Sequence, residues 1–324
     1  MDKSKLLYLS RVDVERVSLD MATIIQLLEK VFREKGKGRV EMPPKPGIHT
    51  QPDAFIHAMP AFIPALHSAG LKWVSGYPDN QKRNLPYISG LLILNDDETG
   101  IPYCMMDCTW ITAYRTGAAT ALAAKYLARP ESQTAGILAC GVQGRTNLEA
   151  LAVLFPIQQV YAYDISRDAQ DRFVAEMRAK LDIEITGVEH PKQAVVGSDL
   201  VVSSGPIVKH PQPTISKDWL KPGTFGSAVD FDSYWHPEAM KRMDKISTDD
   251  HAQFQYYRSA GYFQETPQPY ADLGELVIGS KPGREQEDEC TLAINLGLAL
   301  EDMAVAPEIY QRARQLGMGT WLSL

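Results

Sequence analysis

The glycine-rich turn at residues 139–144 constrains the fold of this chain most strongly. It reads Ala-Cys-Gly-Val-Gln-Gly, follows an apolar segment typical of a buried strand, and opens a segment of helical periodicity. A second apolar segment then ends in Asp164, 23 positions after Gly141. A strand, a tight turn, a helix and a strand that ends in an acid form the pattern of a dinucleotide-binding βαβ unit.

The residue types of this turn suit a nucleotide. Gly141 lets the backbone approach a pyrophosphate, and the following helix N-terminus offers unpaired N–H groups and the positive end of its dipole. The carboxylate of Asp164 suits the hydroxyls of a ribose. Ala139 replaces the first glycine of the usual motif, so an ordinary strand-to-helix turn that needs glycine is the alternative interpretation.

We expect the cofactor to be NAD, because Asp164 repels the 2′-phosphate of NADP. Arg167 can accommodate that phosphate, so NADP is not excluded. A later apolar segment ends at Ser203 and Ser204, where strands of such a sheet contact the cofactor. The cofactor contacts predicted from this pattern are Gly141, Val142, Gln143, Gly144, Asp164, Ser166, Arg167, Ser203 and Ser204.

Strand and helix patterns alternate through residues 119–300, which predicts an α/β domain of Rossmann type that binds NAD(P). Residues 54–107 instead read as short strands that end in a hairpin. We expect residues 1–118 to form a second, β-rich α+β domain, completed by residues 301–324. The whole of 291–317 reads as helical. With 44% hydrophobic residues among 324, the chain has apolar material for two cores.

Composition excludes several partners. Lys and Arg total 33 against 40 Asp and Glu, giving a net charge of −7 with no basic block, so we expect no nucleic-acid binding. No apolar run reaches the roughly 18 residues of a membrane span, and no signal peptide is visible at the start. The four cysteines form no CxxC pair, and the histidines lack metal-ligand spacing. These features predict a cytoplasmic protein without a metal site.

Several short segments together resemble the ornithine cyclodeaminase/mu-crystallin family. They are Gly-Leu-Lys-Trp-Val at 70–74, Met-Asp-Cys-Thr at 106–109, Arg-Thr-Gly-Ala-Ala at 115–119, Ala-Lys-Tyr-Leu-Ala-Arg at 124–129, Cys-Gly-Val-Gln at 140–143 and Gly-Leu-Ala-Leu-Glu-Asp at 297–302. The family includes cyclodeaminases, archaeal-type alanine dehydrogenases, ketimine and cyclic-imine reductases, and iminosuccinate reductases. The resemblance implies an oxidoreductase of amino-acid metabolism whose first domain binds substrate and forms a homodimer.

The resemblance also implies which residues bind the substrate. Its carboxylate needs cations, and Arg115, Lys72 and Lys45 match family positions. The alternatives are a solvated loop lysine for Lys45, a surface lysine for Lys72, and a structural ion pair between Arg115 and Asp107. Two further cofactor contacts are implied by the same resemblance: Thr116 and Ala228.

The catalytic acid implied by the resemblance is an aspartate after Gly223-Thr224. Alignment from that pair selects Asp232, with Asp230 in reserve, and Lys72 as a second group for proton transfer. The alternative is that one of the two aspartates caps a helix that begins near His236.

Two departures from the family pattern bear on the substrate. His57 stands where cyclodeaminases look to have a glutamate that suits a distal amine, so we expect a neutral or acidic substrate side chain. Ile294, Asn295 and Leu296 replace a more polar set near the nicotinamide. The sequence therefore predicts an NAD(P)H-dependent reductase of a small α-imino acid. The alternatives are an ornithine-type cyclodeaminase that uses NAD catalytically and a mu-crystallin-like ligand-binding protein.

Overall fold

The computed structural model describes residues 4–324 and divides into two compact units. Unit 1 runs to Arg115 and includes the C-terminal segment Leu298–Leu324, and unit 2 is Thr116–Gly297. The boundary falls within helix α3, Thr109–Leu127. This helix begins at Thr109, because the Asp107 carboxylate accepts a hydrogen bond from the N–H of Thr109 and favours a helix start there.

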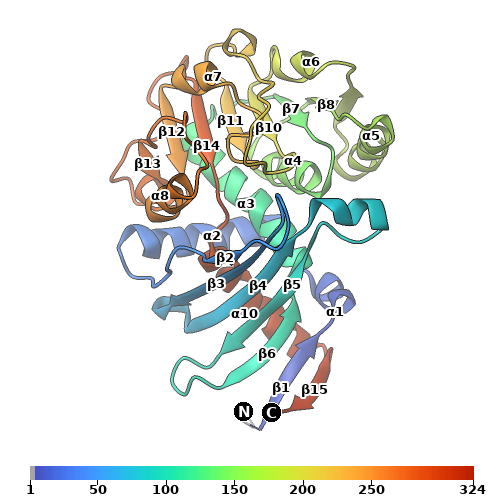
Figure 1. Ribbon diagram of the computed structural model, residues 1–324, viewed down its shortest axis with the longest axis vertical. Coiled ribbons are helices and arrows are strands. Elements are labelled where there is room, and N and C mark those ends of the chain that lie inside the picture. Colours follow the sequence, from blue (N-terminus) through green and yellow to red (C-terminus); the bar gives the residue numbers. More distant parts are fainter. Residues whose placement is uncertain (1–3) are drawn as a thin grey trace. The chain divides into compact units, whose positions relative to one another are not determined.

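Unit 1 is built on a seven-stranded sheet in the order β15-β1-β6-β5-β4-β3-β2 (Figure 1). Its neighbouring strands are antiparallel except for the parallel pair β1 and β6. The strands are β1 (Lys5–Leu9), β2 (Gly47–Ile48), β3 (Phe55–Ile63), β4 (Ser68–Gly76), β5 (Ile88–Asn95), β6 (Pro102–Asp107) and β15 (Thr320–Ser323). The expected hairpin is the antiparallel pair of β5 and β6.

Three α-helices of unit 1 accompany this sheet: α1 (Arg11–Val17), α2 (Met21–Gly36) and α10 (Ala299–Gln315). Asp20 caps α2 by accepting a hydrogen bond from the N–H of Thr23, and the apolar stripe of α2 is buried. Helix α10 packs on β3, β4 and α2. Because successive side chains of a strand point to opposite faces, Lys72 and Val74 of β4 are buried while Trp73 is exposed.

Unit 2 contains an eight-stranded sheet in the order β13-β12-β14-β11-β10-β7-β8-β9, and every neighbouring pair is parallel. The strands are β7 (Thr134–Leu138), β8 (Gln159–Tyr163), β9 (Glu184–Gly187), β10 (Leu200–Ser203), β11 (Phe225–Ala228), β12 (Lys245–Thr248), β13 (Ala271–Asp272) and β14 (Thr291–Ile294). The strands β9-β8-β7-β10-β11 follow the 3-2-1-4-5 part of the Rossmann strand order, with β14 next to β11, and this arrangement confirms the predicted fold class.

Six α-helices lie wholly within unit 2: α4 (Val142–Leu154), α5 (Arg167–Leu181), α6 (Pro191–Val195), α7 (Pro237–Lys241), α8 (His251–Ser259) and α9 (Leu273–Val277). The prediction of one helix over 291–317 is wrong at its start, because Thr291–Ile294 forms β14 between β11 and β12. A short apolar run fits a buried parallel strand as well as a helix, and only its sheet partners decide. Among the described residues, no helix is long and apolar enough to cross a membrane.

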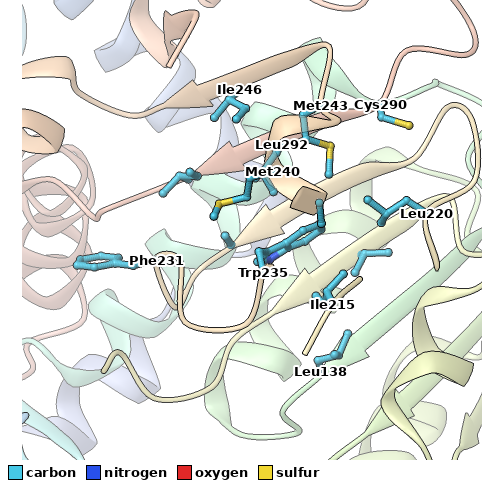
Figure 2. Packing of buried hydrophobic residues seen from close by; sticks show 14 of the residues in the cluster. Leu138, Ile215, Leu220, Phe231, Trp235, Met240, Met243, Ile246, Cys290 and Leu292 are labelled. Atoms are coloured by element: carbon cyan, nitrogen blue, oxygen red, sulfur yellow. The ribbon is translucent and has the colours of Figure 1, made fainter. Parts of the chain in front are cut away.

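A buried apolar cluster in unit 2 surrounds Trp235, with Ile215, Met240 and Leu292 among its members (Figure 2). The indole packs on β11 at Gly226, where a Cβ atom would lie 2.5 Å from the Trp235 ring. Its N–H donates to the hydroxyl of Ser203 at the end of β10, at 2.9 Å. This packing anchors the chain after β11 to the sheet.

Candidate active site

The glycine turn joins β7 to α4, as expected. A Cβ atom on Gly141 would meet nothing within 4 Å, so the backbone there is open to a ligand. A Cβ on Gly144 would lie 2.4 Å from the carbonyl oxygen of Ala139, so glycine permits the close approach of helix and strand. Ala139 itself has φ 75°, in the left-handed region that favours glycine. The turn keeps the glycine geometry although its first glycine is missing.

Asp164 follows β8 and is tied to this turn. Its Oδ2 accepts a hydrogen bond from the N–H of Cys140 at 2.7 Å, and its Oδ1 accepts from the N–H of Ser166 at 2.8 Å. Each carboxylate oxygen has a second lone pair, so the group retains acceptors for ribose hydroxyls. Ser166 caps α5, and the exposed Arg167 lies 3.1 Å from the Asp171 carboxylate. The turn and the acid together fit a dinucleotide.

The other predicted cofactor contacts lie mostly on the same sheet edge. Leu138 of β7 pairs with Ser203 of β10, and Ser203 pairs with Ala228 of β11. Ser204 donates its hydroxyl to the carbonyl oxygen of Ala139 at 3.1 Å. Val142 and Gln143 begin α4, and Thr116 lies half-buried in α3. The carboxyl ends of parallel strands are where such sheets bind ligands.

The predicted carboxylate-binding cations form a buried charged cluster in unit 1. The Lys72 ammonium lies 2.6 Å from Asp302, and the Arg115 guanidinium lies 2.6 Å from Glu301 and 3.4 Å from Asp302. Three of these side chains are fully buried, and Arg115 is 5% exposed. Lys72 comes from strand β4, Arg115 from helix α3, and the two carboxylates from the first turn of α10.

The partners of Arg115 differ from the sequence-based alternative. The expected structural partner was Asp107, but that carboxylate accepts hydrogen bonds from Thr109 instead. Glu301 and Asp302 were not proposed as site residues. The sequence feature that identifies them is a pair of adjacent acidic residues within an otherwise apolar helical segment, which would bury them when it packs. Lys72 is not a surface lysine, because it is fully buried.

Burial shifts the charges of this cluster. It lowers the pKa of Lys72, and the neighbouring Arg115 cation lowers it further against the opposing effect of Asp302. Burial also raises the pKa of Glu301, although Arg115 opposes that shift. When Glu301 carries a proton, two cations face one carboxylate, and the cluster attracts an anion.

Lys45 and His57 complete this group in unit 1. Both are buried, so Lys45 is not a solvated loop lysine. The His57 ring stacks on Phe55 with ring centroids 4.3 Å apart, and a Cβ on Gly47 would lie 2.3 Å from that ring. Burial lowers the pKa of His57 to about 3, and the positive charges of Lys45 and Lys72 contribute. His57 is therefore neutral at physiological pH.

The candidate acid Asp232 belongs to unit 2, in the turn after β11. Its Oδ2 accepts a hydrogen bond from the Thr266 hydroxyl at 3.3 Å, and its Oδ1 has no hydrogen-bond partner among the described residues. Burial raises the pKa of its carboxyl group. The preceding Phe231 has φ 63°, a conformation that is costly for an aromatic residue and that sets the direction of Asp232.

Asp230 differs from Asp232 in that both of its oxygens are engaged. Oδ1 accepts from the Ser203 hydroxyl at 2.9 Å, and Oδ2 accepts from the N–H of Gly205 at 3.1 Å. Neither aspartate caps α7, whose N-cap residue is His236. Within residues 4–324, Asp232 alone of the two retains an oxygen without a hydrogen-bond partner.

A further group of side chains has the spacing of metal ligands. His251, Asp272 and Glu275 bring one ligand atom each within 4.8 Å of one another. Asp272 and Glu275 form a capping box at the start of α9, and His251 is hydrogen-bonded to Glu275 at 3.1 Å. Helix capping accounts for this arrangement.

Comparison with known families and proteins shows where this chain belongs. A family model described as the ornithine cyclodeaminase/mu-crystallin family matches residues 4–317. The chain belongs to this family. The resemblance inferred from the short motifs is thereby confirmed over nearly the whole sequence.

Three proteins of known name are similar to this ornithine cyclodeaminase/mu-crystallin family member over nearly their whole length. The alanine dehydrogenase of Archaeoglobus fulgidus is 34% identical over 323 residues and is matched over 97% of both chains. The structure of Thermococcus litoralis Δ(1)-pyrroline-2-carboxylate reductase with NADH and L-proline has a TM-score of 0.88 at 33% identity, covering 97% of this chain and 99% of that one. An archaeal alanine dehydrogenase dimer with bound NAD has a TM-score of 0.88 at 32% identity, covering 99% of both.

Proposed function

We propose that this family member is an NAD(P)H-dependent reductase of a small α-imino acid, acting in reverse as an amino-acid dehydrogenase. The observation that carries the proposal is the pair of buried cations, Lys72 and Arg115, held by buried carboxylates. Burying these charges costs desolvation free energy, so their presence in the interior indicates a functional role. Binding a substrate carboxylate is such a role. The relatives named for alanine dehydrogenase and pyrroline-carboxylate reductase activity support this class.

The residues of unit 1 hold the substrate. Arg115 clamps the carboxylate, with Lys72 and Lys45 adding positive charge, and each charge-assisted hydrogen bond contributes about 1.5–3 kcal/mol. Glu301 and Asp302 orient the two innermost cations. Burial raises the pKa of Glu301, which favours its protonated form and reduces the negative charge that faces the two cations.

The residues of unit 2 hold the cofactor and move a proton. Gly141 and the start of α4 suit a pyrophosphate, and Asp164 suits a ribose, with NAD preferred over NADP. When bound, the reduced nicotinamide supplies hydride to the substrate's α carbon. Asp232 donates the proton to the imine nitrogen through Oδ1, which has no hydrogen-bond partner in the described part of the chain, because its raised pKa lets it carry a proton nearer neutral pH.

The neutral His57 limits which substrate side chains are favoured. Without a positive charge it gives no ion pair to an acidic side chain, and it offers no anion to the distal ammonium of ornithine. A small neutral side chain or a cyclic imine fits best. This charge state favours the reductase over the cyclodeaminase.

We also propose a homodimer formed through the open face of the unit 1 sheet. Trp73 and Leu91 are directly paired across β4 and β5 and are 45% and 39% exposed. Leu71 and Ile93 form the next outward-facing pair along the same strands and are partly buried. Contiguous exposed apolar side chains of this kind mark protein interfaces, and a relative's structure is described as a dimer.

The decisive experiment follows oxidation of NADH and NADPH by absorbance. The panel contains pyruvate, oxaloacetate and glyoxylate, each with ammonia or methylamine, and the cyclic pyrroline- and piperideine-carboxylates. We expect oxidation with one imine that has a neutral side chain. Ammonia release from ornithine with NAD, without net NADH change, would identify a cyclodeaminase instead. Cofactor binding without any turnover would identify a ligand-binding protein.

A further inference from the structure

Asp230 is a buried carboxyl that proton transfer does not explain. It has no exposed surface, and both oxygens are used. Oδ1 accepts from the Ser203 hydroxyl at 2.9 Å, and Oδ2 accepts from the N–H of Gly205 at 3.1 Å. Both hydrogen bonds therefore reach the segment that leaves the carboxyl end of β10.

These contacts extend across three strand ends. The Ser203 oxygen that donates to Asp230 also accepts from the Trp235 indole at 2.9 Å. On the other side, Ser204 donates to the carbonyl of Ala139 at the glycine turn. The ends of β7, β10 and β11 are joined in this way through Ser203, Ser204 and Asp230.

The segment after β10 depends on such contacts for its position. Residues 206–213 contain neither helix nor strand. A Cβ on Gly205 would lie 2.1 Å from the Tyr234 hydroxyl oxygen, so this backbone passes directly over the Tyr234 side chain. Val208 is held by its N–H, which donates to the Ser233 hydroxyl at 3.2 Å. The turn that contains Asp230 thus forms the support on which the segment rests.

We propose that Asp230 is a positioning residue that fixes Ser203–Gly205 in the conformation that binds the nicotinamide cofactor. The inference rests on the proposed function, because it takes this sheet edge as the cofactor site. A carboxylate offers acceptors to a hydroxyl and an N–H at once, whereas an asparagine of the same shape offers one acceptor oxygen. Buried donors left without an acceptor weaken the arrangement they belong to.

The test measures NADH binding directly, by the fluorescence change of NADH on titration with protein. We expect Asp230→Ala to raise the Kd for NADH about 10-fold, as loss of a buried hydrogen bond implies. Asp230→Asn keeps one acceptor and should restore part of the affinity. Ser203→Ala removes a bond of the same network, so the double variant should bind little worse than Asp230→Ala alone. In turnover assays the KM for NADH should rise, with kcat at saturating NADH little changed.

Asp232→Asn is the matched control, because it changes the neighbouring carboxyl outside this network. It should bind NADH like the unaltered protein while losing turnover. Unchanged NADH affinity in Asp230→Ala overturns the inference, as does additive loss in the double variant. If Asp230→Ala does not fold, Asp230→Asn and Ser203→Ala decide by the same measurement. Absence of NADH binding in the unaltered protein overturns the proposed function itself.

Discussion

Lys72 and Arg115 show why single residues in this protein depend on distant partners. An isolated cation in a protein interior is strongly disfavoured, and each of these has a carboxylate within 2.6 Å. The two carboxylates are not equivalent. Burial raises the pKa of Glu301, whereas Asp302 faces Lys72 and lies near Arg115. Variants at the two positions should therefore behave differently.

Asp302→Asn should lower the free energy of unfolding by about 3–5 kcal/mol, because it leaves Lys72 buried without its carboxylate partner. Glu301→Gln should have a smaller effect, since glutamine resembles the protonated carboxyl that burial favours. Urea denaturation at neutral pH measures both. Equal destabilisation by the two variants would show that Glu301 is ionised in the folded protein.

Asp230 should make stability depend on pH. Burial raises its pKa to about 7, with the nearby Asp232 carboxylate adding to the shift and the donors Ser203 and Gly205 opposing it. A raised carboxyl pKa means that the folded state keeps a proton that the unfolded chain releases. The stabilisation from protonated Asp230 is fully present below the pKa that this carboxyl has in the unfolded chain, and it is lost as pH rises through about 7.

Relative to Asp230→Asn, the unaltered protein should therefore lose up to about 1.4 kcal/mol per pH unit between roughly pH 4 and 7. Tyr234 also faces Asp230, but its own pKa is raised to about 12, so it does not titrate in this window. Paired urea titrations at pH 5 and pH 8 measure the difference. A constant difference between the two proteins would mean that Asp230 folds as a carboxylate.

Among the elements, the β7–α4 turn shows local sequence and local geometry in conflict. Ala139 adopts φ 75° although it has a Cβ, and a left-handed conformation of this kind costs about 1–2 kcal/mol. The turn nevertheless keeps its form, because its neighbours require it. Gly144 fits against the Ala139 carbonyl, and Asp164 accepts from the N–H of Cys140.

Ala139→Gly should raise the free energy of unfolding by about 0.5–1 kcal/mol, because relief of strain exceeds the entropy that glycine adds to the unfolded chain. Its matched control is Ala150→Gly within α4, which should destabilise by about 1 kcal/mol. Thermal and urea unfolding of both variants test this. Destabilisation by Ala139→Gly would show that the alanine is not strained.

At the scale of the whole molecule, the outward face of the unit 1 sheet decides the proposed assembly. Trp73 lies between the buried Lys72 and Val74, and Leu91 precedes the buried Leu92, so strand alternation places both exposed side chains on one face of the sheet. An apolar patch on a sheet face needs a partner to be removed from water. A second copy of the chain satisfies this with the same surface on both sides.

Trp73→Asp should convert a dimer to a monomer, because it places a charge in the centre of this patch. Val153→Asp, at an exposed position of α4, should leave the assembly unchanged. Sedimentation analysis of the three proteins measures the outcome. A monomeric unaltered protein, or a dimeric Trp73→Asp variant, would contradict the proposed interface.

The sequence by itself determined the Rossmann-type fold, because that pattern is local. The strand, the glycine turn, the helix and Asp164 all fall within about thirty residues, and their periodicity follows from backbone geometry. It also selected Lys72, Arg115 and Asp232 as candidates through family motifs. The prediction of a helix from residue 291 was wrong at its start, because the short apolar run Thr291–Ile294 fits a strand as well as a helix.

The tertiary structure alone decided which groups face these candidates. Arg115 meets Glu301, a partner 186 residues away in the chain, instead of the nearby Asp107. It also decided that His57 is neutral and that both oxygens of Asp230 accept hydrogen bonds, whereas one oxygen of Asp232 has no partner among the residues that the structure describes. Charge state and hydrogen-bond partners depend on burial and on neighbours brought together by folding, and no local pattern contains that information.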